Sequence, residues 1–158
     1  MSLAMMPRIK YMETAESVAV ISAGVFFLLG LLSGIWKYQQ IMASENGQAH
    51  PYVDICHRSS LLYAFAAILL AKFVEISQLP SIVEIVAVSA VLLYFASAIF
   101  TYFIHGLLQD TDNQLKPPFR VGKTSISAKL ISVHMWMLIA AEVFGFLVLF
   151  YGVIVALI

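Results

Sequence analysis

Imidazole is the side chain of this sequence that is best suited to chemistry. The 158 residues include four histidines, and neutral imidazole is a common ligand of haem iron and of other transition metals. His57, His105 and His134 are therefore candidate ligands of one haem group. As an alternative, His50, Asp54 and His57 are spaced to share one face of a helix. That spacing predicts a transition-metal site with an open position for water or substrate.

The elements that position these residues are long apolar segments. Hydrophobic residues make up 61% of the chain and charged residues 11%, whereas soluble domains have roughly 45–50% and about 25%. A helix needs about 20 apolar residues to cross a bilayer, and four segments qualify: 16–38, 52–78, 81–108 and 127–158. We therefore predict an all-α, single-domain integral membrane protein, a four-helix bundle with both termini on the same side.

This composition excludes several classes of protein. A soluble enzyme and a disordered regulator both need far more charge than the chain carries. Nine Lys and Arg residues balance nine Asp and Glu residues, so no overall basic field is present to hold a nucleic acid.

The predicted topology places all four histidines near one face of the membrane. His57 lies near the start of the second span, His105 near the end of the third and His134 near the start of the fourth. A rise of about 1.5 Å per residue puts these three within roughly 5–10 Å of that face. The loop over it, 109–126, is long and polar, and such loops are usually functional or disordered. It is either a cap over the histidines or a solvated linker.

Basic residues near the ends of the spans indicate the orientation. Arg8 and Lys10 lie on the side of the two termini. The opposite side, which holds the first and third loops, carries six basic residues: Lys37, Arg58, Lys116, Arg120, Lys123 and Lys129. Because Lys and Arg concentrate on the cytoplasmic side, we expect these loops in the cytoplasm and the protein in a bacterial inner membrane.

Two ionisable side chains lie deep within the spans. By residue count, Lys72 and Glu142 reach a similar depth from opposite faces. Buried charges are expensive unless paired, so a Lys72–Glu142 pair would neutralise both and serve as a strut or a proton path. On the first span, the spacing of Gly30 and Gly34 predicts a close helix contact.

Several positions resemble the membrane-embedded epoxide isomerases typified by styrene oxide isomerase, to which the hydroxylaminobenzene mutases are distantly related. His57, in ICHRSSLLYAF, falls where that family has its haem-ligating histidine. Tyr102, in FTYFIHG, falls where the family has a substrate-facing tyrosine. Asn113-Gln114, in TDNQLKPP, resembles an Asn-Gln pair in the third loop of the family. The sequence departs from the family at Tyr63, where the family has an asparagine that contacts the epoxide oxygen.

The resemblance implies a haem b-dependent isomerase that acts on a small apolar epoxide, or a related substrate, taken from the bilayer. Ferric haem would act as a Lewis acid on the substrate oxygen, and ring opening with a 1,2-shift would give a carbonyl product. His57 would be the axial ligand and Tyr102 a hydrogen-bond donor to the developing oxyanion. Tyr63 and Asn113 are the other candidate catalytic residues. The resemblance also implies a homo-oligomer, a trimer.

Histidines outside the family pattern keep two other functions open. His50, His105 and His134 have no counterpart in the family, and a second histidine on the iron would close it to substrate. The chain would then be a membrane cytochrome or a metal-binding electron-transfer subunit. The third hypothesis is a non-catalytic accessory membrane subunit with incidental histidines.

Overall fold

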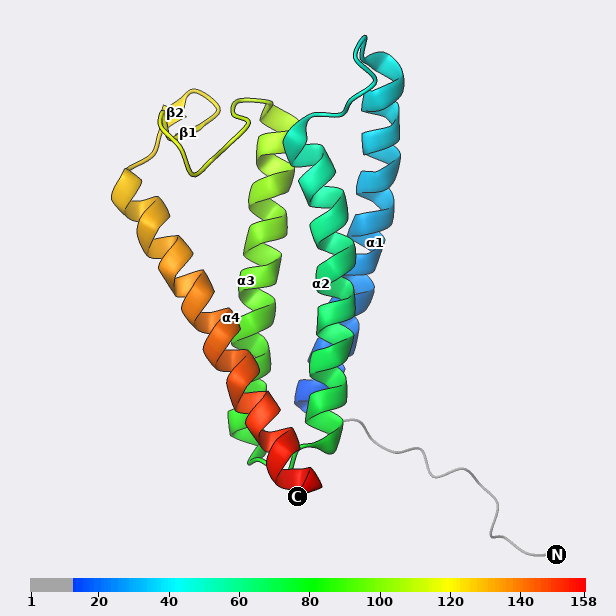
Figure 1. Cartoon of the computed structure of the whole chain (residues 1–158), viewed down its shortest axis with the longest axis vertical. Coiled ribbons are helices and arrows are strands. Elements are labelled where there is room, and N and C mark those ends of the chain that lie inside the picture. Colours follow the sequence, from blue (N-terminus) through cyan, green and yellow to red (C-terminus); the bar gives the residue numbers. More distant parts are fainter. Residues whose placement is uncertain (1–12) are drawn as a thin grey trace, which may run out of the picture.

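Four long helices account for most of the computed structural model, which describes residues 13–158. They are α1 (Thr14–Ala43), α2 (Pro51–Ile76), α3 (Ser81–Leu108) and α4 (Ala128–Leu157). Each is long and apolar enough to cross a membrane. α1 begins and α4 ends at the same end of the bundle, and the loops after α1 and α3 lie at the other end (Figure 1). The predicted all-α, four-helix membrane fold is confirmed.

The ends of the helices follow local signals in the sequence. Pro51 occupies the first turn of α2, where its missing N–H costs nothing, and the His50 side chain accepts a hydrogen bond from the Tyr52 N–H at 3.3 Å. α1 continues to Ala43, five residues beyond the predicted end at Tyr38. Residues 39–43 favour helix, and a polar residue need not end a helix that has left the bilayer.

A small hairpin in the third loop has no counterpart in the predicted pattern. Strands β1 (Arg120–Val121) and β2 (Thr124–Ser125) pair antiparallel, and the Ile126 N–H donates to the Phe119 carbonyl at 2.9 Å. Gly122 has φ +59° in the connecting turn, a conformation that glycine adopts without strain. Strands of two residues are too short to produce an alternating pattern in the sequence.

Glycines set how closely the helices approach one another. A Cβ at Gly30 of α1 would lie 2.6 Å from Leu61 Cδ2 of α2, so the predicted close contact of the first span is made with α2. On α4, a Cβ at Gly145 would lie 2.6 Å from Val91 Cγ2 and 2.9 Å from the Ala87 carbonyl oxygen of α3. Helix packing with so little space requires glycine.

α4 buries residues against the bundle only along its second half. Its buried residues are Gly145, Leu149, Gly152 and Val153. Toward its first residues, α4 diverges from α3, and the third loop bridges the two helices (Figure 1). This divergence separates two helices at the end of the bundle where the histidines lie.

The outer surface of the helices is apolar, as a bilayer requires. Large hydrophobic side chains are exposed on all four helices, among them Ile21, Leu62, Phe65, Ile82, Leu93 and Phe144. In lipid these side chains contact acyl chains and not water. Arg8 and Lys10, on which the predicted orientation partly depends, lie outside the described residues.

We expect replacement of Gly145 by valine to destabilise the protein. The added side chain must displace both Val91 and the backbone of Ala87, and overpacking of this kind costs about 1–3 kcal/mol. Thermal unfolding in detergent, followed by circular dichroism, should show a lower midpoint.

The matched control for this substitution is Gly24→Ala. A Cβ at Gly24 meets no atom of the described residues within 4 Å, so the midpoint should stay the same or rise slightly. An unchanged midpoint for Gly145→Val would contradict the described contact between α3 and α4.

Candidate functional site

His57 lies on the face of α2 that packs against α1. Its Nδ1 donates to the Gly30 carbonyl oxygen at 2.8 Å. The ring occupies the space left by Gly34, where a Cβ would lie 2.9 Å from His57 Cε1. A carbonyl oxygen only accepts hydrogen bonds, so Nδ1 carries the proton of the neutral ring and Nε2 carries the lone pair. No hydrogen bond joins Nε2 to any residue in 13–158.

This hydrogen bond gives His57 the arrangement of a metal-ligating histidine. Such histidines donate one ring N–H to a carbonyl or carboxylate, which fixes the tautomer and orients the other nitrogen toward the metal. The Gly30 carbonyl and the space at Gly34 do both for His57. The hydrogen bond and packing of His57 therefore fit a histidine that ligates a metal, including the iron of haem.

A cavity of about 410 Å³ lies between α3, α4 and the third loop. Its lining brings together four of the residues singled out in the sequence: Tyr63, Tyr102, His105 and His134. Loop residues complete the wall, namely Gln114, Leu115, Arg120, Val121 and Ile126. The remaining lining is largely apolar, so this is a space for a small, mostly apolar molecule with a few polar contacts.

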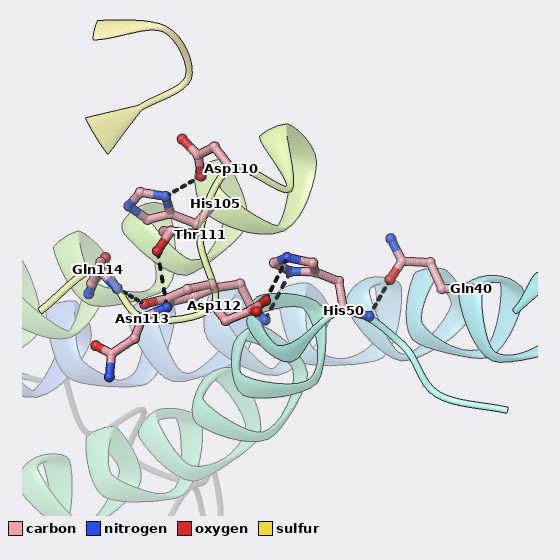
Figure 2. Close-up of polar contacts among 9 residues, drawn as sticks. Gln40, His50, His105, Asp110, Thr111, Asp112, Asn113 and Gln114 are labelled. Carbon is pink, nitrogen blue, oxygen red and sulfur yellow. Dashed lines mark hydrogen bonds and ion pairs between the residues drawn. The ribbon is translucent and has the colours of Figure 1, made fainter. Parts of the chain in front are cut away.

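The third loop is fixed over this cavity by polar contacts (Figure 2). His105, which is 2% exposed, donates from Nδ1 to Asp110 Oδ1 at 2.7 Å. The Gly122 N–H donates to the other oxygen of Asp110. The Gln114 N–H donates to the Tyr52 hydroxyl at 2.5 Å. The loop therefore forms one wall of the cavity instead of a detached linker.

Asp110 holds the first part of this loop as an anion. Burial raises the pKa of its carboxyl. The hydrogen bonds from His105 and from the Gly122 N–H together lower this pKa by more than burial raises it, so the net pKa is below the usual value. The carboxylate is consequently ionised at neutral pH, where it accepts from both donors.

Aromatic rings form the inner wall of the cavity. The hydroxyl groups of Tyr63 and Tyr102 interact, although they come from different helices. Tyr63 also stacks on Phe95, with ring centroids 4.1 Å apart. The His134 ring lies against Tyr94 with centroids 5.7 Å apart. Two phenol groups and two imidazoles thus border the same space.

The predicted partnership of Lys72 with Glu142 is wrong. Lys72 Nζ lies 2.9 Å from Glu75 Oε2, on an exposed part of α2. Glu142 Oε1 is buried and has no hydrogen-bond partner among the described residues. Equal depth in the membrane does not determine the face of a helix on which a residue lies, and these two side chains lie on different faces.

The alternative metal set of His50, Asp54 and His57 is not brought together. Asp54 is held by Lys37 at 2.6 Å and by Arg58 at 2.8 Å, the latter a pairing that its spacing favours. His50 precedes α2 and caps it, so it does not continue the helical face. In the described part of the chain, no three His, Cys, Asp or Glu side chains are placed to hold a metal ion.

The structure also separates the histidines that were expected to share a haem. His105 and His134 line the cavity, but His57 does not. Six positions along α2 separate His57, which contacts α1, from Tyr63, which lines the cavity, so the two occupy different faces of the helix.

The two residues of the Asn113-Gln114 pair in the third loop have different environments. Asn113 is exposed, and its side chain accepts from the Leu115 N–H at 3.0 Å, which shapes the turn. Gln114 lines the cavity, and its buried Oε1 has no partner among residues 13–158. The role of Asp110 was not predicted, although its position five residues after His105, just beyond the end of α3 at Leu108, was a usable signal.

Comparison with known proteins adds no relative. No protein-family model, curated protein or solved structure matches the chain significantly. The likeness to the epoxide isomerases rests on His57, Tyr102 and the Asn113-Gln114 pair as quoted from the sequence.

We expect Asp110→Asn to loosen the third loop. Hydrogen bonds to a charged group contribute about 1.5–3 kcal/mol, so local opening of 109–126 should increase about tenfold or more. Limited proteolysis or amide hydrogen exchange of the loop in detergent measures this.

The effect has a defined dependence on pH. The folded pKa of Asp110 is below its unfolded value, so the stabilisation is complete above about pH 4 and is lost as the pH falls through the folded pKa. Asp112→Asn is the matched control, because Asp112 is 82% exposed and 3.6 Å from His50 Nε2. Equal protection of the loop in all three proteins would refute the role of Asp110.

Proposed function

We propose that this protein is a membrane-embedded, haem b-dependent isomerase of small apolar epoxides or related substrates. The observation that carries the proposal is the hydrogen bond from His57 Nδ1 to the Gly30 carbonyl, which leaves Nε2 as the free lone pair. His57 would hold the haem. When bound, ferric haem supplies a Lewis acid for a substrate oxygen.

Residues of the cavity between α3 and α4 would bind and orient the substrate. The Tyr102 hydroxyl would donate a hydrogen bond to the oxygen on which negative charge develops. Tyr63 would support Tyr102 through the interaction of their hydroxyls. The loop wall, fixed by Asp110 and Gln114, would exclude water from a reactive intermediate.

A complete site would require more than one copy of the chain. Within one chain His57 faces α1, whereas Tyr102 faces the cavity. If both act on one substrate, one copy contributes the iron ligand and its neighbour contributes the cavity. This supports a homo-oligomer, and the resemblance to the epoxide isomerases favours a trimer.

The position of the site suits a substrate dissolved in lipid. The cavity lies between two helices that are apolar enough to span a membrane. Small apolar molecules partition into the hydrocarbon core and could enter from it. By the bias of Lys and Arg residues, the loops after α1 and α3 would be cytoplasmic in a bacterial inner membrane.

The visible spectrum of the purified protein tests whether the protein binds haem and whether His57 holds it. After expression with sufficient haem, we expect a haem spectrum with an open or water-ligated iron that is lost in His57→Ala and retained in His134→Ala. A colourless, folded wild-type protein would contradict the proposal and favour an accessory subunit. A six-coordinate low-spin spectrum lost in both variants would favour a membrane cytochrome.

The Tyr102→Phe variant tests, separately from haem binding, whether the cavity is the site of the reaction. The variant should keep the haem spectrum, because Tyr102 does not contact His57, and should lose most of its turnover of an aryl epoxide. Removal of one donor to a developing oxyanion costs about 10²–10³-fold in rate. Product formation measured by gas chromatography gives the rate, and unchanged turnover would exclude this role for Tyr102.

A further inference from the structure

Glu142 is a half-buried residue with one buried carboxyl oxygen, and the proposed isomerisation does not use it. It lies on α4 one turn beyond Leu138, which lines the cavity together with Ile131 and His134 on the same side of the helix. Glu142 is thus the next side chain toward the deep end of the cavity. It has no ion pair with any described residue, and its Oε1 is buried without a hydrogen-bond partner.

Two tyrosines lie near this carboxyl group. Tyr63 and Tyr102 are both close enough to feel its charge. The other ionisable groups of the cavity are His105, His134 and Arg120, which lie toward the loop. His134 precedes Glu142 by eight positions, about 12 Å along the helix. The Glu142 carboxyl group therefore lies next to the deep end of the cavity, near two tyrosines, and no basic residue of the cavity lining lies beside it among residues 13–158.

This combination of groups is suited to a cation. A carboxylate inside a span is expensive unless an opposite charge pairs with it. The faces of aromatic rings attract cations as well. Lys72, the nearest candidate by depth, is paired with Glu75. A cationic molecule in the cavity would supply that opposite charge and would favour the ionised carboxylate over its protonated form.

We propose that the deep end of this cavity binds the protonated amine of a small ring compound, with Glu142 as the counter-charge and Tyr63 and Tyr102 alongside it. This narrows the substrate class of the proposed isomerase to ring compounds that carry an amine. The inference rests on the cavity being the substrate site, but it does not rest on the haem.

Binding of two matched probes tests the inference. Benzylamine and benzyl alcohol have similar size and shape but differ in charge at neutral pH. In phosphatidylcholine nanodiscs at pH 7, calorimetry should show that the wild-type protein binds benzylamine at least about tenfold more tightly, which corresponds to about 1.4 kcal/mol. Equal affinities for the two probes would overturn the inference without any variant.

Glu142→Gln keeps the shape of the side chain and removes its charge. The variant should bind benzylamine at least about tenfold more weakly, while its affinity for benzyl alcohol stays within about twofold. Glu84→Gln is the matched control, because Glu84 also has a buried carboxyl oxygen without a partner but lies about 21 Å along α3 from Ala98, which lines the cavity. Circular dichroism verifies that both variants fold. Unchanged benzylamine binding by Glu142→Gln would refute the role of Glu142.

The outcome is separable from the test of the proposed function. A protein without haem that still prefers benzylamine would contradict only the haem-dependent isomerase. A protein with the haem spectrum and without a preference for benzylamine would contradict only the amine site. Both measurements use the same purified full-length chain.

Discussion

A bilayer offers no water to a polar group, so each buried polar side chain must find its partner within the protein or in a ligand. This constraint explains where the polar side chains of the bundle lie. Ser33 donates back to the Leu29 carbonyl of its own helix at 2.7 Å. His57 uses a carbonyl of the neighbouring helix. Glu142 Oε1 has neither solution among the described residues, and the same is true of Ser60 Oγ and Glu84 Oε1.

The same four helices provide two different kinds of space. Between α1 and α2, glycines bring the backbones close enough for the His57 ring to be held by a carbonyl. Between α3 and α4, the buried residues of α4 are confined to its second half, and a cavity lies beside its first half. The tight contact between α1 and α2 suits a side chain such as His57 whose orientation matters. The open space between α3 and α4 suits a bound molecule that must enter and leave.

The sequence predicted the spans well because hydrophobic length is a one-dimensional property. It also placed His105 and His134 at a similar depth, since depth in the membrane follows from counting residues, and both line the cavity. Which face of a helix a residue occupies was harder to predict. His57 was expected beside His105, but it faces α1 instead, because the packing of α1 on α2 decides that face.

Two further errors have the same physical origin. Lys72 and Glu142 share a depth, but they lie on different faces and do not meet. His50 fits a helical spacing with Asp54 and His57, but the helix begins only at Pro51, and Lys37 takes the Asp54 carboxylate. Both errors concern which side chains on different elements meet, and the periodicity of apolar residues within one helix does not contain that information.

Because α4 is packed closely at Gly145 and Gly152 but not near its first residues, a tilt of the helix would pivot about these two glycines. From Gly145 to the first residue of α4 the helix extends about 25 Å, so a tilt of about 5° would move that end by about 2 Å. Val91 and Leu79 lie opposite these glycines, so a change in the size of either side chain would change the width of the cavity near the other face of the membrane. The width of the cavity would then depend on residues that do not line it.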